Sequence, residues 1–285
     1  MAEQGQNLDQ LRLEQREYWS NAAESWKELW ATRERANQPI ADRLVQLAQI
    51  KPGDRVLDIA TGLGEPAVTA ARLVGPGGLV VATDQAPGMI AGARERAASL
   101  GMSNMEFVET DAETLAVGPR QFNAVVCRMG MMFVPNLERA ARRIAELLLP
   151  GGRFATAVWS VPEKVPMISV GLEVARGVLG TPPRDPNAPH PLRLGNPQPL
   201  LEALRAAGFK DVTVEPITIS NEWPNAQVCA EHLSKSGPLR ALLSSQTPDS
   251  VSKVISAIRA ALGKFADSTG TIRMVNEAWC ICGHI

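Results

Sequence analysis

The chain has 285 residues, of which 45% are hydrophobic and 21% charged, with a formal net charge of −1. This composition is ordinary for a globular protein and the length suits one large α/β domain. Balanced charge without a Lys/Arg block argues against nucleic acid or an anionic membrane surface as the main partner. Four cysteines without C-x-x-C spacing and three scattered histidines predict no metal site. The polar N-terminus and the lack of a membrane-length apolar run predict a cytoplasmic protein with reduced thiols.

The N-terminal segment is rich in aromatic residues. Residues 8–34 have the spacing of one or two amphipathic helices, and a further helix is expected over about 37–49. Four of the thirteen aromatic residues of the chain fall in the first stretch: Tyr18, Trp19, Trp26 and Trp30. Such a face either packs on the domain or lines a ligand site, and it also suits a cationic ligand. We expect a helical cap over residues 1–50, with Tyr18, Trp19 and Trp26 as pocket candidates.

A strand, a glycine turn and a helix follow one another after the cap. The apolar strand that begins at Arg55 is interrupted by Asp58 and runs into a turn containing Gly62 and Gly64. A helix is expected over 66–73. Glycines are needed in such a turn because a Cβ would block the turn itself or the approach of a ligand to the backbone. The pattern predicts a buried parallel strand with a ligand site beyond its carboxyl end.

The next acid strengthens the prediction of a nucleotide site. A second apolar strand ends at Asp84, about twenty residues past the glycines, where a carboxylate reaches ribose hydroxyls. Residues 62–67 also satisfy the G-x-G-x-x-G/A pattern of nicotinamide dinucleotide sites. Against that alternative, Asp58 lies where dinucleotide folds run apolar residues into the glycine. The acids Asp111 and Glu113, at the end of the third strand, also have no role in such a site.

Alternation of strands and helices continues to residue 159, which predicts a parallel sheet covered on both faces. Strands are expected over 105–109, 122–127 and 153–159, with a helix over 137–149. Nine of the 21 prolines then fall between Pro162 and Pro199, which indicates a loop or short helical cap. A helix at 198–207, a strand at 212–220, two helical runs within 221–268 and a last strand from 271 complete the chain. We expect a single domain with its core at 51–160, lid insertions at 161–196 and 221–270, and a final strand at 271–285.

Residues at four consecutive strand ends form an ordered set: Asp58 with its glycine turn, Asp84, Asp111-Ala112-Glu113, and Cys127-Arg128-Met129. This set resembles a class I S-adenosylmethionine-dependent methyltransferase over residues 50–160, most like the ubiquinone/menaquinone-biosynthesis type. The segments that carry the resemblance are 57–64, 83–89, 111–113, 128–134 and 149–153. It implies a Rossmann-like three-layer α/β sandwich, with a mostly parallel seven-stranded sheet, an antiparallel last strand and helical lid insertions.

The resemblance also implies a cofactor, S-adenosylmethionine, and its contacts. Asp58 would orient the loop and face the amino acid end of the cofactor, and the backbone of Ala60, Thr61, Gly62, Leu63 and Gly64 would lie along the methionine moiety. Asp84 would hold the ribose hydroxyls, with Gln85 and Met89 beside the adenine. Asp111 and Ala112 would bind the adenine edge, with Glu113 in the same motif, and the backbone at Cys127 and Arg128 would take the ammonium group. The chain departs from the family at Ala60 or Thr61, where glycine is usual, and at Arg128, where a small polar residue is usual.

The acceptor is expected to be a small aromatic or lipophilic molecule under a hydrophobic lid. Its candidate pocket residues are Tyr18, Trp19, Trp26, Met129, Met132 and Trp159. Transfer to a hydroxyl needs a base, for which His232 and His190 are the candidates, although packed or solvated histidines are the commoner case. O-methylation is preferred over C-methylation of a quinol-like ring. A non-catalytic S-adenosylmethionine-binding protein and an NAD(P)-dependent oxidoreductase stay open, as does the choice between monomer and homodimer.

Overall fold

The protein is built on one seven-stranded sheet with the strand order β3-β2-β1-β4-β5-β7-β6. The computed structural model describes residues 2–182, 185, 188–235 and 237–285. The strands are β1 (Arg55–Ile59), β2 (Leu79–Asp84), β3 (Met105–Glu109), β4 (Phe122–Arg128), β5 (Leu148–Trp159), β6 (Lys210–Trp223) and β7 (Ile272–His284). Strands β1 to β5 are parallel, whereas β7 is antiparallel to both β5 and β6. The predicted mostly parallel sheet with an antiparallel last strand is confirmed.

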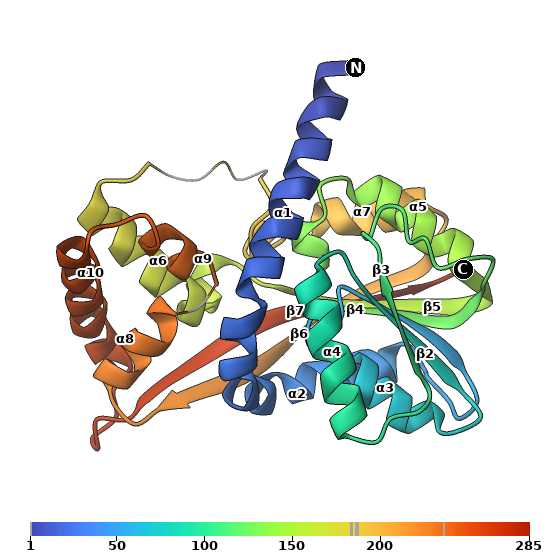
Figure 1. The fold of residues 1–285 in the computed structure, drawn as a ribbon, viewed down its shortest axis with the longest axis horizontal. Coiled ribbons are helices and arrows are strands. Elements are labelled where there is room, and N and C mark those ends of the chain that lie inside the picture. The colour runs from blue at the N-terminus through green and yellow to red at the C-terminus, as the bar shows by residue number, and fades with distance from the viewer. Residues whose placement is uncertain (1, 183–184, 186–187, 236) are drawn as a thin grey trace.

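Helices cover both faces of this sheet (Figure 1). Helices α2 and α3 pack on one face, where α2 contacts β4 to β7, while α5 and α7 lie on the other. The α-helices are α1 (Ala2–Glu28), α2 (Trp30–Leu47), α3 (Ala67–Val74), α4 (Pro87–Ser99), α5 (Leu137–Leu147), α6 (Pro166–Leu179), α7 (Gln198–Ala206), α8 (Ala226–Ser234), α9 (Gly237–Leu243) and α10 (Pro248–Ala261). Short 3-10 turns span Met131–Phe133, Pro162–Lys164 and Leu262–Phe265. The three-layer arrangement agrees with the sequence-based expectation.

Several predicted element boundaries are wrong. The helix expected at 37–49 is α2, which begins at Trp30 and continues through Pro39. Strand β5 begins at Leu148 and not at residue 153, so Leu148 and Leu149, expected at the end of a helix, belong to the strand. Strand β6 runs to Trp223, three residues into the segment assigned to the second lid insertion. That insertion then holds three α-helices in place of the two expected, because the break at Gly237-Pro238 starts a separate helix α9.

The apolar residues form three clusters that match the three parts of the molecule. The largest lies around the sheet, with Phe122 and Phe154 fully buried. A second joins α6, α8, α9 and α10 to the far ends of β6 and β7 and contains Trp223 and Leu239. These two strands extend from the sheet beneath the lid helices (Figure 1). A third, small cluster lies beneath α1 and includes Leu63 and Met89. The lid therefore has its own core and is held to the sheet by continuous strands.

Within the described residues, no helix combines the length and the apolar character needed to cross a membrane.

Candidate active site

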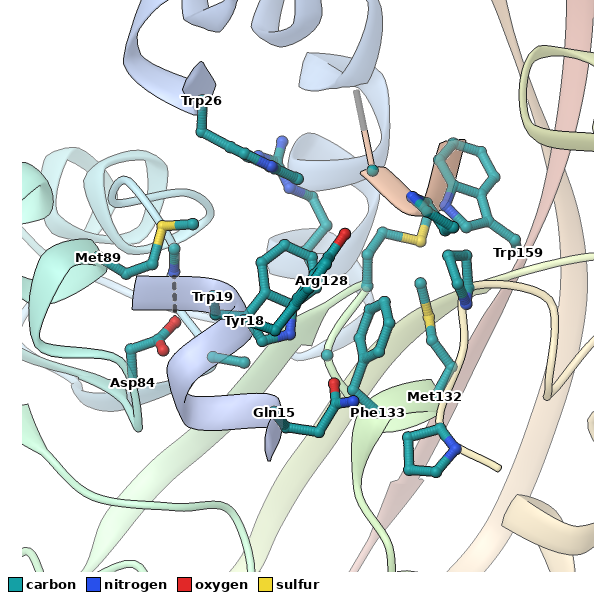
Figure 2. A pocket seen from close by; sticks show the side chains of 18 of the residues that line it. Gln15, Tyr18, Trp19, Trp26, Asp84, Met89, Arg128, Met132, Phe133 and Trp159 are labelled. Carbon is teal, nitrogen blue, oxygen red and sulfur yellow. Dashed lines mark hydrogen bonds between the residues drawn. The ribbon is translucent and has the colours of Figure 1, made fainter. Parts of the chain in front are cut away.

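A cavity of about 330 Å³ lies where the strand ends, the N-terminal helices and the lid meet. Aromatic side chains from α1 and sulfur-containing side chains near β4 surround it (Figure 2). Of the predicted cofactor residues, those that line it are Ala60, Thr61, Gly62, Leu63, Asp84, Gln85, Met89, Asp111, Ala112, Glu113 and Arg128. The predicted acceptor residues Tyr18, Trp19, Trp26, Met129, Met132 and Trp159 line it as well. One cavity therefore joins the predicted cofactor and acceptor regions.

The glycine turn after β1 exposes its backbone to this cavity. Ala60 has φ 55° and Gly62 has φ 56°, both in the left-handed region where a residue with a Cβ is strained. A Cβ built on Gly62 would meet nothing within 4 Å, so open space lies beside the peptide. The Thr61 amide donates to the Thr83 carbonyl at 2.8 Å, which fastens the turn to β2. A glycine would adopt the positive φ of Ala60 without strain.

Asp84 joins the turn to the end of β2. Its Oδ2 accepts from the Gly62 amide at 3.0 Å and its Oδ1 from the Ala86 amide at 2.9 Å. The side chain lines the cavity although the residue is only 7% exposed. Burial raises the pKa of Asp84 from 3.8 to about 6, even though these two amide donors favour the carboxylate. Each carboxylate oxygen keeps a second lone pair for a ligand donor such as a ribose hydroxyl.

Asp58 does not line the cavity, and its contact with the cofactor stays a prediction. Its Oδ2 accepts from the Ala67 amide at 3.1 Å, which orients the turn by capping the first turn of α3. Its Oδ1 is buried and has no hydrogen-bond partner among the described residues. Burial raises the pKa of Asp58 from 3.8 to about 8. The acid supports the loop from beneath, as predicted, but it is not part of the cavity wall.

The Asp111–Glu113 motif after β3 is held by its own hydrogen bonds. Asp111 Oδ1 accepts from the amides of Glu113 and Thr114 at 2.8 and 3.0 Å. Glu113 is 3% exposed, forms an ion pair with Arg12 of α1 and accepts from the Asn136 amide at 3.0 Å. Asp111 and Ala112 can therefore face a ligand, whereas the Glu113 carboxylate is engaged in fastening α1 to the core.

Gly64 and Cys127 are two further predicted cofactor residues that do not line the cavity. Cys127 is fully buried, its carbonyl accepts from Thr156 Oγ1 at 2.8 Å, and burial raises the pKa of its thiol to about 12. Gly64 instead packs near α4, where a Cβ would lie 3.7 Å from that of Ala93. The Cys127 thiol therefore lies in the core, because successive side chains of a strand point to opposite faces of the sheet.

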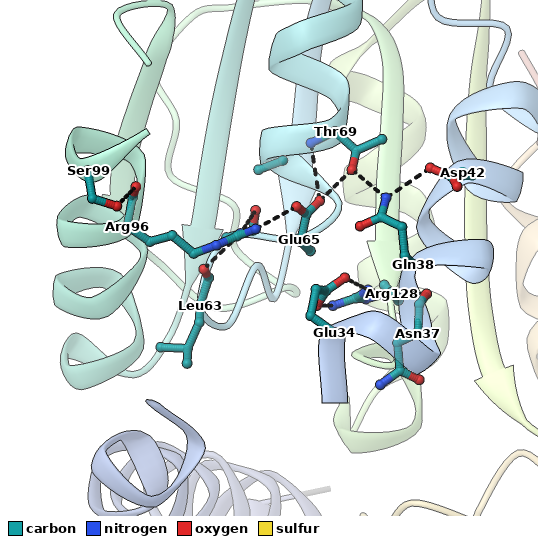
Figure 3. A network of polar contacts seen from close by, with 12 residues as sticks. Glu34, Asn37, Gln38, Asp42, Leu63, Glu65, Thr69, Arg96, Ser99 and Arg128 are labelled. Carbon is teal, nitrogen blue, oxygen red and sulfur yellow. Dashed lines mark hydrogen bonds and ion pairs between the residues drawn. The ribbon is translucent and has the colours of Figure 1, made fainter. Parts of the chain in front are cut away.

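Arg128 lines the cavity and is paired with a carboxylate of α2. Its Nη1 and Nη2 donate to the two oxygens of Glu34 at 2.7 and 2.8 Å, and the two side chains are 10% and 11% exposed. Figure 3 shows this pair beside a second network, in which Arg96 and Thr69 both donate to Glu65. The unusual arginine at this family position is thus explained by α2, which supplies its counter-charge.

Trp19 is the centre of the aromatic group of the N-terminal cap. Its ring packs edge-on against Tyr18, Trp26 and Phe133, with centroid distances of 5.0, 5.5 and 4.9 Å. Phe133 follows β4, so these contacts join the cap to a strand end (Figure 2). Ion pairs of Arg16 with Glu109, and of Lys27 with Glu95, tie α1 to the core. The aromatic face therefore packs and lines the cavity at the same time.

The two histidine candidates line different cavities. His232, on α8, lines the cavity and lies against Trp223 with a centroid distance of 5.6 Å. His190 lines a neighbouring cavity of about 400 Å³, and its Nδ1 accepts from the Leu192 amide at 3.2 Å. His190 is therefore not placed with the predicted acceptor residues, and only His232 of the pair remains a candidate base for the main cavity.

The sequence-based prediction missed several residues of the cavity wall: Arg12, Gln15, Trp30, Asn37, Glu65, Gly130, Asn221 and Trp223. Gly130 had a detectable signal, because it directly follows a strand end. A Cβ there would lie 2.7 Å from both the Ala60 Cβ and the Cys127 Sγ, so the two loops can meet only at a glycine. Asn221 and Trp223 carried no such signal, since only the extension of β6 brings them to the cavity.

The residues of the cofactor half fit S-adenosylmethionine on the structure's own evidence. The wall offers a carboxylate with spare lone pairs at Asp84, a polar turn at Asp111 and open space over Gly62. These groups match a ribose, an adenine edge and an amino acid moiety respectively.

Comparison with known proteins agrees with this geometry. Residues 56–152 match a family described as a methyltransferase domain. The ubiquinone/menaquinone biosynthesis C-methyltransferase of Pseudomonas entomophila is 38% identical over 119 residues, which are 41% of this chain and 46% of that protein. A Pseudomonas fluorescens protein of the same description is 37% identical over 127 residues, 44% of this chain and 50% of that protein. The chain thus spans about half the length of these curated relatives.

Solved structures extend the likeness to the lid. A methyltransferase-like protein from Bacillus halodurans has a TM-score of 0.54 at 21% identity and covers 86% of this chain and 97% of its own. The [4+2]-cyclase SpnF has the same TM-score and identity and covers 88% and 82%. At such identity these structures show the fold alone. Residues 56–152 therefore match a methyltransferase domain, and the chain has the fold of S-adenosylmethionine-dependent methyltransferases.

Proposed function

We propose that the protein transfers the methyl group of S-adenosylmethionine to a small aromatic or lipophilic acceptor, with an oxygen as the preferred methylated atom. The observation that carries this proposal is the single cavity, which has strand-end acids and a glycine turn in one half and an apolar lid in the other. Such a cavity places a cofactor and an apolar acceptor in direct contact and away from bulk water.

In the cofactor half, each group has one proposed contact with the cofactor. Asp84 accepts from the ribose hydroxyls, and the Asp111–Ala112 turn faces the adenine. The backbone from Ala60 to Leu63 lies along the methionine moiety. When bound, the sulfonium supplies a methyl group that is already activated, so the protein's main task is to place the acceptor in line with it.

The acceptor half combines aromatic and apolar groups with one titratable side chain. Trp19, Trp159 and Met132 supply flat or adaptable apolar surface, and His232 can accept the proton of an acceptor hydroxyl at a ring nitrogen. The family match ends at residue 152, before the lid begins. It therefore supports the proposed cofactor, whereas the identity of the acceptor rests on the lid. The curated relatives are named as C-methyltransferases, which makes an activated ring carbon the second acceptor class to test.

The decisive experiment combines binding with an acceptor screen. Isothermal titration with S-adenosylhomocysteine and, separately, with NADH tests the cofactor. Radiolabelled methyl transfer to a panel of phenols and naphthoquinols then tests the reaction, with mass spectrometry to locate the added methyl group. Tight S-adenosylhomocysteine binding without transfer to any acceptor would leave a non-catalytic binding protein, whereas binding of NADH alone would support an oxidoreductase.

A histidine variant separates the two acceptor classes. His232→Asn is expected to lower kcat for a phenolic acceptor by about 10²- to 10⁴-fold, because general-base assistance is lost, while S-adenosylhomocysteine binding is retained. The matched control is His284→Asn. His284 is the last residue of β7, its Nε2 lies 2.9 Å from Asp211 Oδ2, and it does not line the cavity. Unchanged kcat in His232→Asn would rule out this histidine as the base and favour an acceptor that needs none.

A further inference from the structure

The part of the lid that faces the cavity is almost entirely apolar. Most of its described lining residues between 161 and 270 are apolar, among them Met167, Leu172, Leu233 and Leu239. Within this set, hydrogen-bonding side chains other than the Trp223 indole belong to Asn221 and His232. Asn221 and Trp223 are two residues apart on β6 and share a face, and Trp223 lies against His232. The polar groups of the lid are therefore gathered in one patch.

Backbone groups determine which way the Asn221 amide points. Asn276 of β7 is fully buried; its Oδ1 accepts from the Met167 amide at 3.0 Å, and its Nδ2 donates to the Met274 carbonyl at 3.1 Å. A backbone donor and a backbone acceptor thus assign the two ends of this side chain unambiguously. Asn276 Nδ2 also donates to Asn221 Oδ1 at 3.0 Å, so the oxygen of Asn221 is directed at β7.

This arrangement leaves the donor end of Asn221 for the cavity. No described residue accepts a hydrogen bond from Asn221 Nδ2. This nitrogen is also absent from the set of fully buried polar atoms that lack a partner, so it is accessible. An acceptor molecule that fills the cavity removes water from this amide. A hydrocarbon surface would leave the amide N–H unpaired, which is costly, whereas an oxygen atom would satisfy it.

We propose that Asn221, oriented by Asn276, selects the acceptor by donating a hydrogen bond to a carbonyl or hydroxyl oxygen at the lid end of the cavity. This inference rests on the proposed function and narrows its substrate class. The acceptor is an aromatic or lipophilic ring molecule that carries an oxygen facing β6. Asn221 determines specificity and Asn276 positions it, and neither takes part in the methyl transfer itself.

The test uses two bicyclic probes that differ in one oxygen, the ketone 1-tetralone and the hydrocarbon tetralin. Dissociation constants are measured by tryptophan-fluorescence titration in the presence of S-adenosylhomocysteine. Comparing the ratio of the two constants between protein variants cancels the different affinities of the probes for water. In Asn221→Leu the relative preference for the ketone is expected to fall by about 5- to 10-fold, the effect of losing one neutral hydrogen bond.

A second variant distinguishes loss of the hydrogen bond from loss of the fold. Asn221→Asp retains an oxygen for Asn276 Nδ2 and, at a pH at which the new carboxyl is ionised, has no donor, so it is expected to lose the ketone preference with its fold intact. In Asn221→Leu, Asn276 Nδ2 still donates to the Met274 carbonyl, and a thermal melt reports whether either variant has unfolded. An unchanged probe ratio in both folded variants, or binding of neither probe to the wild-type chain, overturns the inference. If the wild-type chain prefers the ketone but does not bind S-adenosylhomocysteine, the proposed function is overturned instead.

Discussion

Asp84→Asn separates binding of the cofactor from stability of the fold. The wild-type carboxylate accepts from two backbone amides and, on our proposal, from both ribose hydroxyls. The amide of asparagine keeps one acceptor oxygen and turns an N–H₂ group toward the other donors. Hydrogen bonds to a charged group contribute about 1.5–3 kcal/mol each, so the loss of the ribose contacts is expected to weaken S-adenosylhomocysteine binding at least 100-fold.

The stability of the ligand-free protein is expected to change much less. The folded-state pKa of Asp84 is raised from 3.8 to about 6, so the folded protein holds the proton more tightly than the unfolded chain does. The free energy of unfolding therefore falls by about 3 kcal/mol as the pH rises from about 4 to about 6, and this contribution is level above that. Asparagine avoids this cost but leaves one buried amide unpaired, which costs about 1–3 kcal/mol. The two effects nearly cancel.

The measurements are isothermal titration with S-adenosylhomocysteine and urea denaturation, both at pH 7.5. Asp249→Asn is the matched control, because Asp249 is an exposed acid paired with Lys253 on the lid helix α10. We expect the control to bind like the wild type, and Asp84→Asn to bind at least 100-fold more weakly with an unfolding free energy within about 2 kcal/mol of the wild type. Affinity of Asp84→Asn within threefold of the wild type would refute the assignment of Asp84 to the ribose.

Three further predictions follow from the same structure. Wild-type affinity for S-adenosylhomocysteine should fall by up to tenfold per pH unit below about pH 6 as Asp84 is protonated, and titrations from pH 5 to 8 should find no such dependence in Asp84→Asn. Arg128→Gln leaves the buried Glu34 unpaired and should lower the free energy of unfolding by about 3–5 kcal/mol in urea, with much of the loss recovered when Glu34→Gln is added; a loss below 1 kcal/mol would contradict this. Gly130→Ala places a Cβ 2.7 Å from two side-chain atoms and should lower the melting temperature. The control Gly177→Ala in α6, with open space around its Cβ, should raise it, and the reverse order would show that the site at Gly130 accommodates a Cβ.

The core of the fold was predictable because its signals are local in the sequence. An apolar strand must be followed by turn residues and an amphipathic helix, and repetition of this unit leads to a parallel sheet with a shared carboxyl edge. Asp84 and Asp111 could be placed at that edge from their positions after two strands. Errors arose at element ends: the helix expected at 37–49 begins at Trp30, and the last two residues of the helix expected at 137–149 belong to β5.

The direction of individual side chains could not be predicted in the same way. Asp58 and Cys127 lie in strands β1 and β4, and their side chains do not line the cavity although both strands end beside it. Arg128 departs from the family pattern, and only the packing of α2 against β4 reveals that Glu34 neutralises it. A pattern in sequence identifies the loop, but the dihedral angles within it decide which side chain faces a ligand.

By itself the sequence predicted the fold class, a cofactor site at the strand ends and a lid, because strands, turns and helices are each signalled by residues close together in the chain. Only the tertiary structure decided which histidine lines the main cavity, that Glu113 fastens α1, and that Asn221 reaches the cavity under the control of Asn276. These pairings join residues between 55 and 101 positions apart, and no local periodicity connects such residues. They depend on the packing of separately formed elements, through which distant side chains come within hydrogen-bond distance.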